Sequence, residues 1–111
     1  MFVDIEFFGE DPIDNVISCL KFKFDKVIFL GYAKEDMDFV AKETVERFLQ
    51  SAKVGLQNIQ FIAIPSPEYQ RAQDILTDVV LTEQASRNKC YMDLSGGDET
   101  ALAAASFFVL P

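Results

Sequence analysis

The residues of this chain best suited to bind a ligand lie in the run Ser95-Gly96-Gly97-Asp98. An apolar segment precedes the run and a stretch rich in Ala and Leu follows it, which predicts a strand, a tight turn and a helix. Two adjacent glycines let the backbone approach a ligand closely, and the first amides of a helix lack partners within the helix. We therefore expect a phosphate or carboxylate site at this turn.

A second candidate segment, Gly9-Glu10-Asp11, comes directly after the first predicted strand. If Glu10, Asp11 and Asp98 converge, their carboxylates could hold Mg²⁺ for phosphoryl chemistry. A simpler interpretation is that these acids meet the dipoles of helix N-termini, and that the two glycines only form a turn. We assign no catalytic residue, no metal ligand and no cofactor.

Composition excludes several classes of function. The chain has 18 acidic and 10 basic residues, so direct binding to nucleic acid is disfavoured. It has no histidine, which removes the usual Ser-His-Asp and Cys-His mechanisms and histidine zinc sites. Ser95 does not fit the hydrolase nucleophile turn, because Asp93 stands where that motif needs glycine.

The sequence also bears on location. Cys19 and Cys90 are too far apart for a CxxC motif and lie in apolar segments, so we interpret both as reduced core residues. The segment 1–8 lacks a basic leader, and no apolar run approaches the length of about 20 residues that spans a membrane. We expect a cytoplasmic protein without a membrane segment.

Apolar periodicity predicts strands that alternate with helices. Strands are expected at 2–8, 26–30, 58–64 and 90–94, and helices from Pro12, over 36–53, from Ser66-Pro67 and over 100–110. The inward residues are expected to be Val40, Ala41, Thr44, Val45, Phe48 and Leu49 in the second helix, and Ala72, Ile75, Leu76, Val79 and Val80 in the third. This alternation predicts an α/β fold: a Rossmann-like three-layer sandwich with a mainly parallel four-stranded sheet flanked by helices.

Two strand orders fit this pattern, and they give different sites. In the order 3-2-1-4, the loops after strands one and four converge where the strand order reverses. In the flavodoxin-like order 2-1-3-4, the loop Pro65-Ser66-Pro67 would replace the Ser-Gly-Gly loop. The glycine-rich turn favours 3-2-1-4. We expect residues 1–111 to form one domain, and its apolar last helix to be covered by a further part of a longer protein or by a dimer partner.

The run Asp93-Leu94-Ser95-Gly96-Gly97, opening an apolar helix after a fourth strand, resembles the CARF (CRISPR-associated Rossmann fold) family. The closest resemblance is to members fused to a restriction-like nuclease domain. The segment 9–16, which follows the first predicted strand, is also similar to the corresponding segment of those proteins. It begins with acidic residues and continues through Pro12 into a predicted helix that carries Asn15. Ser95, Gly96 and Gly97 match the family's Thr/Ser-Gly-Gly turn, whereas Asp98 and Glu99 stand where the family continues with Thr and Lys.

The resemblance implies a non-catalytic sensor domain in antiviral defence. It would be a homodimer that binds a cyclic oligoadenylate, or another nucleotide or small molecule, across its two-fold axis and controls a C-terminal effector. The ligand-binding residues implied are Gly9, Glu10, Asp11, Ser95, Gly96, Gly97 and Asp98. Two alternatives stay open: a magnesium-dependent phosphoryl-transfer site in the acidic loops, and a purely structural dimerisation module.

Overall fold

The computed structural model describes residues 1–8, 17, 24–32, 39–64, 69–93 and 103. In chain order the elements are β1 (Phe2–Phe7), β2 (Lys26–Tyr32), α2 (Phe39–Ser51), a 3-10 turn (Leu56–Asn58), β3 (Ile59–Ile64), α3 (Tyr69–Ala85) and β4 (Lys89–Asp93). Residues 17 and 103 are also helical. Apart from residues 17 and 103, the predicted helices from Pro12 and over 100–110 lie outside the described residues. Cys19 also lies outside them.

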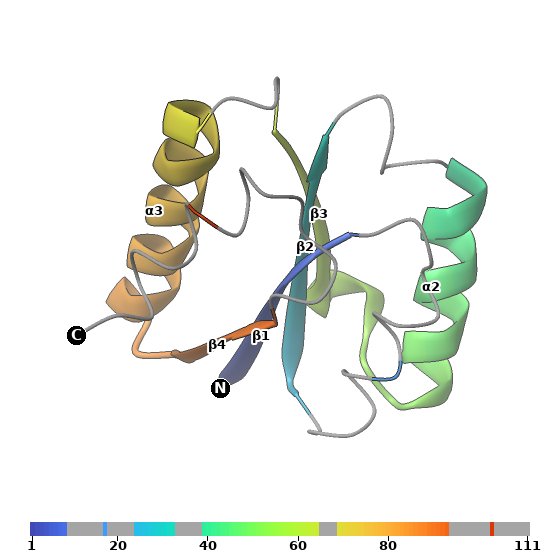
Figure 1. Ribbon diagram of the computed structural model, residues 1–111. Helices are drawn as coiled ribbons and strands as arrows, with labels where there is room; N and C mark the ends of the chain where they lie inside the picture. Colours follow the sequence, from blue (N-terminus) through green and yellow to red (C-terminus); the bar gives the residue numbers. More distant parts are fainter. Residues whose placement is uncertain (9–16, 18–23, 33–38, 65–68, 94–102, 104–111) are drawn as a thin grey trace.

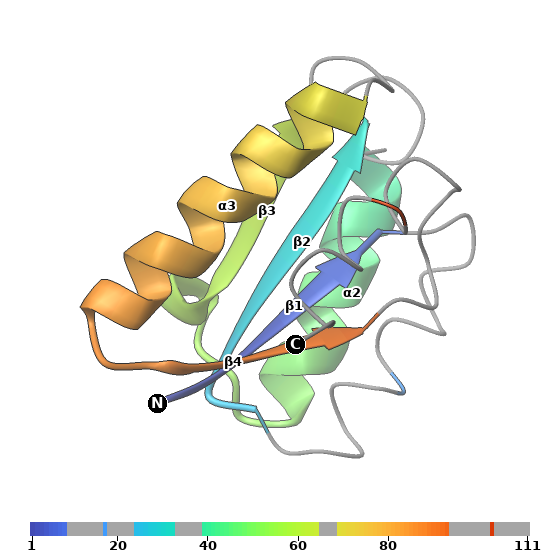
Figure 2. The same cartoon turned by 60° about the vertical axis from the view of Figure 1, so that its left-hand side comes forward.

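The four strands form one sheet in the order β3-β2-β1-β4 (Figures 1 and 2). All three strand pairs are parallel, so the carboxyl ends of all four strands lie at the same end of the sheet, which is called the carboxyl edge below. The predicted order 3-2-1-4 is confirmed, and the flavodoxin-like order is wrong for this chain. None of the described helices combines the length and apolar character needed to cross a bilayer.

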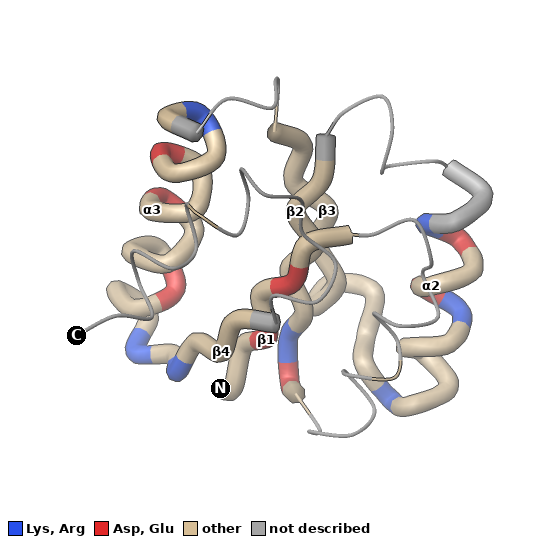
Figure 3. Tube along the Cα trace, viewed as in Figure 1, with Lys and Arg blue, Asp and Glu red and all other residues tan. Residues whose placement is uncertain are grey.

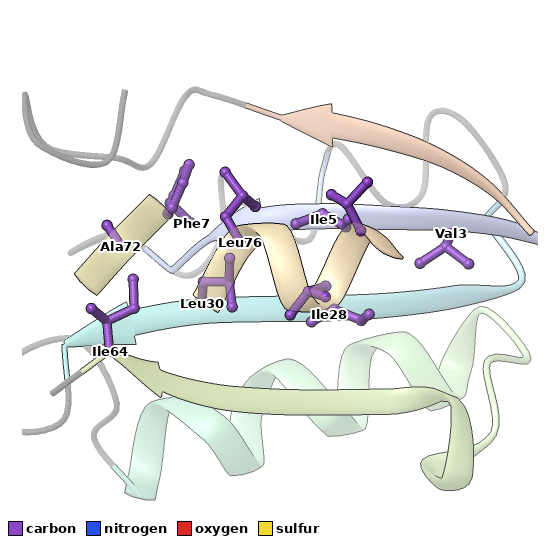
Figure 4. Close-up of a cluster of buried hydrophobic side chains, with 10 residues drawn as sticks. Val3, Ile5, Phe7, Ile28, Leu30, Ile64, Ala72 and Leu76 are labelled. Carbon is purple, nitrogen blue, oxygen red and sulfur yellow. The ribbon is translucent and has the colours of Figure 1, made fainter. Parts of the chain in front are cut away.

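Helices cover both faces of the sheet, which gives three layers (Figure 1). Because side chains alternate along a strand, Val3, Ile5 and Phe7 of β1 point to the face that α3 covers. There they pack with Leu76 and other buried aliphatic residues (Figure 4). The opposite face holds a second cluster, to which α2 contributes Val45 and Leu49. The other members are Phe8, Val27, Phe29 and Ile59.

The helix faces match the sequence pattern unequally. In α3, Ala72, Leu76, Val79 and Val80 are buried and Ile75 packs against them, as predicted. In α2, Val45 and Leu49 are fully buried, but Thr44 and Phe48 are exposed, so their expected inward position is wrong. Val45 and Leu49 lie one turn apart on one line along the helix. The predicted inward side chains of Val40 and Ala41 lie outside those described.

Both described helices end in the same way. Lys53 after α2 and Arg87 after α3 have positive φ angles, 68° and 63°. In each case the next amide donates to a carbonyl five residues earlier: Val54 N to Leu49 O at 3.0 Å, and Asn88 N to Glu83 O at 3.0 Å. This is the Schellman arrangement. The predicted helix over 36–53 therefore ends at Ser51, because the chain turns left-handed at Lys53.

Candidate functional site

The structure places the two strands that lead into the predicted ligand loops side by side. In the register of β1 and β4, Glu6 stands opposite Asp93, so both strands finish at the same edge of the sheet. The predicted ligand-binding residues, Gly9, Glu10, Asp11, Ser95, Gly96, Gly97 and Asp98, lie outside the described residues. The strand ends that precede them are described and adjacent.

Phe8 fixes the chain immediately before the first of these loops. Its amide donates a hydrogen bond of 2.7 Å to Leu30 O, which extends the contact of β1 with β2 by one residue. Its ring meets Phe29 and Phe61 edge-on, at centroid distances of 5.5 and 5.7 Å. Such edge-to-face pairs are favourable beyond their buried area. The chain therefore leaves β1 from a rigid, buried anchor.

Two buried carboxyl groups lie below this edge, and the sequence reading did not anticipate their burial. Asp4 and Glu6 of β1 are 1% and 0% exposed, and acidic positions within β1 are visible in Figure 3. In the described part of the chain, no buried side-chain nitrogen or oxygen lacks a hydrogen-bond partner. The apolar-acidic alternation of β1 is typical of a strand with one wet face, but a central strand of a parallel sheet is buried on both faces.

The described residues offer no metal centre and no activated thiol. Among them, no group of three or more His, Cys, Asp or Glu is placed to hold a metal ion. Cys90 is half-buried and packs against the α3 cluster. Burial raises the pKa of its thiol, and the negative charge of Glu83 raises it further, against a smaller opposite effect of Lys26. A thiol kept protonated is a poor nucleophile.

A third polar group lies at the opposite edge of the sheet, where the strands begin. Lys26 at the start of β2 donates to Glu83 Oε1 of α3 at 2.5 Å, and Asn88 Nδ2 donates to Glu83 Oε2 at 2.8 Å. Burial alone would raise the pKa of Glu83, but the hydrogen bonds from Lys26 and Asn88 and the charge of Lys26 outweigh it and lower the pKa. This group ties α3 to the sheet and lies at the opposite end of the strands from the carboxyl ends of β1 and β4.

A four-stranded parallel sheet in the order 3-2-1-4, with helices on both faces, defines a Rossmann-like α/β domain. No family model matches the sequence, and no curated protein matches it significantly. Among solved structures, the chain is similar to Can2 from Sulfobacillus thermosulfidooxidans, determined in complex with cyclic tetra-adenylate. The TM-score is 0.68 at 20% sequence identity, over 95% of this chain and 28% of that chain. At this level of identity the likeness shows a shared fold alone, and that fold is the Rossmann-like α/β arrangement expected from the sequence.

Proposed function

We propose that this domain is a non-catalytic sensor that binds a cyclic oligoadenylate at the carboxyl ends of β1 and β4. The observation that carries the proposal is the pairing of these two strands, because it starts the Gly9–Asp11 and Ser95–Asp98 segments from one edge of the sheet. Open α/β sheets bind ligands at this edge, where the strand order reverses. The fold shared with Can2, a protein solved with cyclic tetra-adenylate, supports the choice of ligand.

The two glycines of the second segment suit a phosphodiester ring. Gly96 and Gly97 carry no Cβ, so backbone amides there can approach phosphate oxygens closely. The buried anchor at Phe8 holds the other segment at its start. We further propose that two copies of the domain join so that one cyclic ligand contacts both, in a longer protein that acts in antiviral defence.

The first test is a thermal-shift measurement of the chain with cyclic tetra-adenylate. A ligand at 100 times its Kd stabilises the folded state by about 2.7 kcal/mol, so the melting temperature is expected to rise by several degrees. Linear tetra-adenylate, which has similar chemistry but no closed ring, is expected to give a smaller rise. Light scattering on the same samples checks that the ligand is bound by a dimer.

A pair of matched glycine variants makes this test specific. Gly96→Val is expected to remove the shift, because it adds a branched side chain at the proposed ligand turn. Gly55→Val is the control: the three atoms nearest to a Cβ there all belong to the flexible side chain of Gln57, the closest at 2.7 Å, and the ligand shift is expected to persist. Absence of a shift in the wild-type chain, or equal loss in both variants, contradicts the proposal.

A further inference from the structure

An open groove lies between α3 and the strand β3, away from the ligand edge of β1 and β4. Its volume is about 320 Å³, near the lower limit of small ligand sites. The lining residues are Ile28, Gln60, Ile62, Ile75, Asp78, Val79, Thr82 and Glu83. The aliphatic part of the lining comes from β2, β3 and α3, and the polar part comes from α3 and from Gln60.

In the described part of the chain, β3 is an edge strand. It pairs only with β2 there, so the backbone groups on its other side have no partner strand among the described residues. Its sequence, IQFIAI, contains no charged residue and no proline, the features with which proteins commonly block edge pairing. Added strands bind such edges through main-chain hydrogen bonds, while neighbouring pockets select alternate side chains.

The charges around the groove indicate what kind of segment fits. Glu83 is occupied by Lys26 and Asn88. Asp78 is exposed and has no ion-pair partner in the described part of the chain. A second copy of this chain, whose net charge is −8, would bring the same acidic helix face against this one. A basic segment is instead attracted by the negative charge of this surface, which favours its binding.

We propose that the β3 edge is a docking site for an extended, basic and aliphatic peptide segment of a partner protein. The segment adds to the sheet as a strand beside β3. One of its aliphatic side chains enters the groove over Ile62 and Ile75, and a Lys or Arg two residues away, on the same face of the added strand, reaches Asp78. This site is separate from the proposed nucleotide site, and neither depends on the other.

The test uses a fluorescently labelled peptide, Lys-Thr-Ile-Thr-Val-Thr-Lys, with the full chain and anisotropy as the readout. Asp78→Lys is expected to weaken binding by about tenfold or more, because it replaces attraction by repulsion. Asp74→Lys, one turn earlier on α3 and outside the groove lining, makes the same charge change and is expected to alter binding by less than about twofold. Both residues are exposed, so neither change should affect folding.

A second peptide tests whether a strand forms. Neighbouring amides of a strand point to opposite sides, so proline in place of both the central threonine and the valine after it removes one amide that faces β3. This peptide is expected not to bind. The proposal is overturned by no binding of the first peptide, by equal binding of the proline peptide, or by equal effects of Asp78→Lys and Asp74→Lys. A dimer of the chain that is lost when Ile62 is replaced by Lys would also overturn it, because a second copy would then cover β3.

Discussion

Replacing Asp98 by Thr and Glu99 by Lys is expected to raise the affinity for cyclic tetra-adenylate by about tenfold or more. The first change removes one negative charge and the second exchanges a negative for a positive charge, a total of three units toward positive. Near a protein surface, two unit charges about 8 Å apart interact by about 2 kcal/mol before salt screening. A tenfold gain needs only about 1.4 kcal/mol, so the estimate holds even with substantial screening.

The measurement is a calorimetric titration at two salt concentrations. A control with the same change in net charge, Glu43→Lys with Glu46→Thr on α2, is expected to leave the affinity nearly unchanged. The gain from the Asp98 and Glu99 changes should shrink as salt increases. An equal gain in both double variants would show only the effect of net charge and would remove the support for a ligand at this turn.

Glu83→Gln is expected to lower the free energy of unfolding at neutral pH by about 2 kcal/mol. The change keeps the shape of the side chain but leaves the ammonium group of Lys26, which is only 17% exposed, without its counter-charge. Removing one partner of a buried ion pair is costly for this reason. Glu43→Gln is the matched control: its pair with Arg47 is 3.9 Å long and exposed on both sides, so the expected loss is below about 0.5 kcal/mol.

The pH dependence of the Glu83 effect has a definite sign. The pKa of Glu83 is lowered in the folded protein from the ordinary value of 4.5, so its carboxylate form stabilises the fold. That contribution is complete above pH 4.5 and is lost as the pH falls through the lowered folded-state pKa. The stability of the wild-type chain should therefore approach that of Glu83→Gln in acid, as urea unfolding at a series of pH values would show. A gap that stays constant down to strongly acidic pH contradicts this account of the ion pair.

The sequence was sufficient to predict the architecture because the apolar patterns are short and well separated. The residues of β2 and β3 form compact apolar runs, and α3 carries a regular buried stripe from Ala72 to Val80. The strand order was harder, since alternating strands and helices fit two orders equally well. It followed only from the position of the Gly96-Gly97 turn, and the pairing of β1 with β4 confirms it.

Other features depend on tertiary contacts that no local pattern contains. Phe48 continues the 3.6-residue periodicity of α2, yet it is 53% exposed, whereas Val45 and Leu49 are buried against the sheet. The alternation of Asp4 and Glu6 with apolar residues is typical of a strand with one solvent-exposed face, but the sheet order makes β1 central and buries both. The Lys26–Glu83 ion pair joins residues 57 positions apart, so sequence spacing gave no signal for it. The seven predicted ligand residues stay a prediction.

The most direct test of the sensor proposal is an NMR titration of the isotopically labelled chain with cyclic tetra-adenylate, read at each backbone amide. The proposal predicts the largest shifts at Phe7, Phe8 and Asp93, where β1 and β4 end, and little change at Lys26 and Asn88 at the opposite edge. The proposal is contradicted if saturating ligand shifts no amide resonance. It is also contradicted if the resonances of Lys26 and Asn88 shift while those at the ends of β1 and β4 do not.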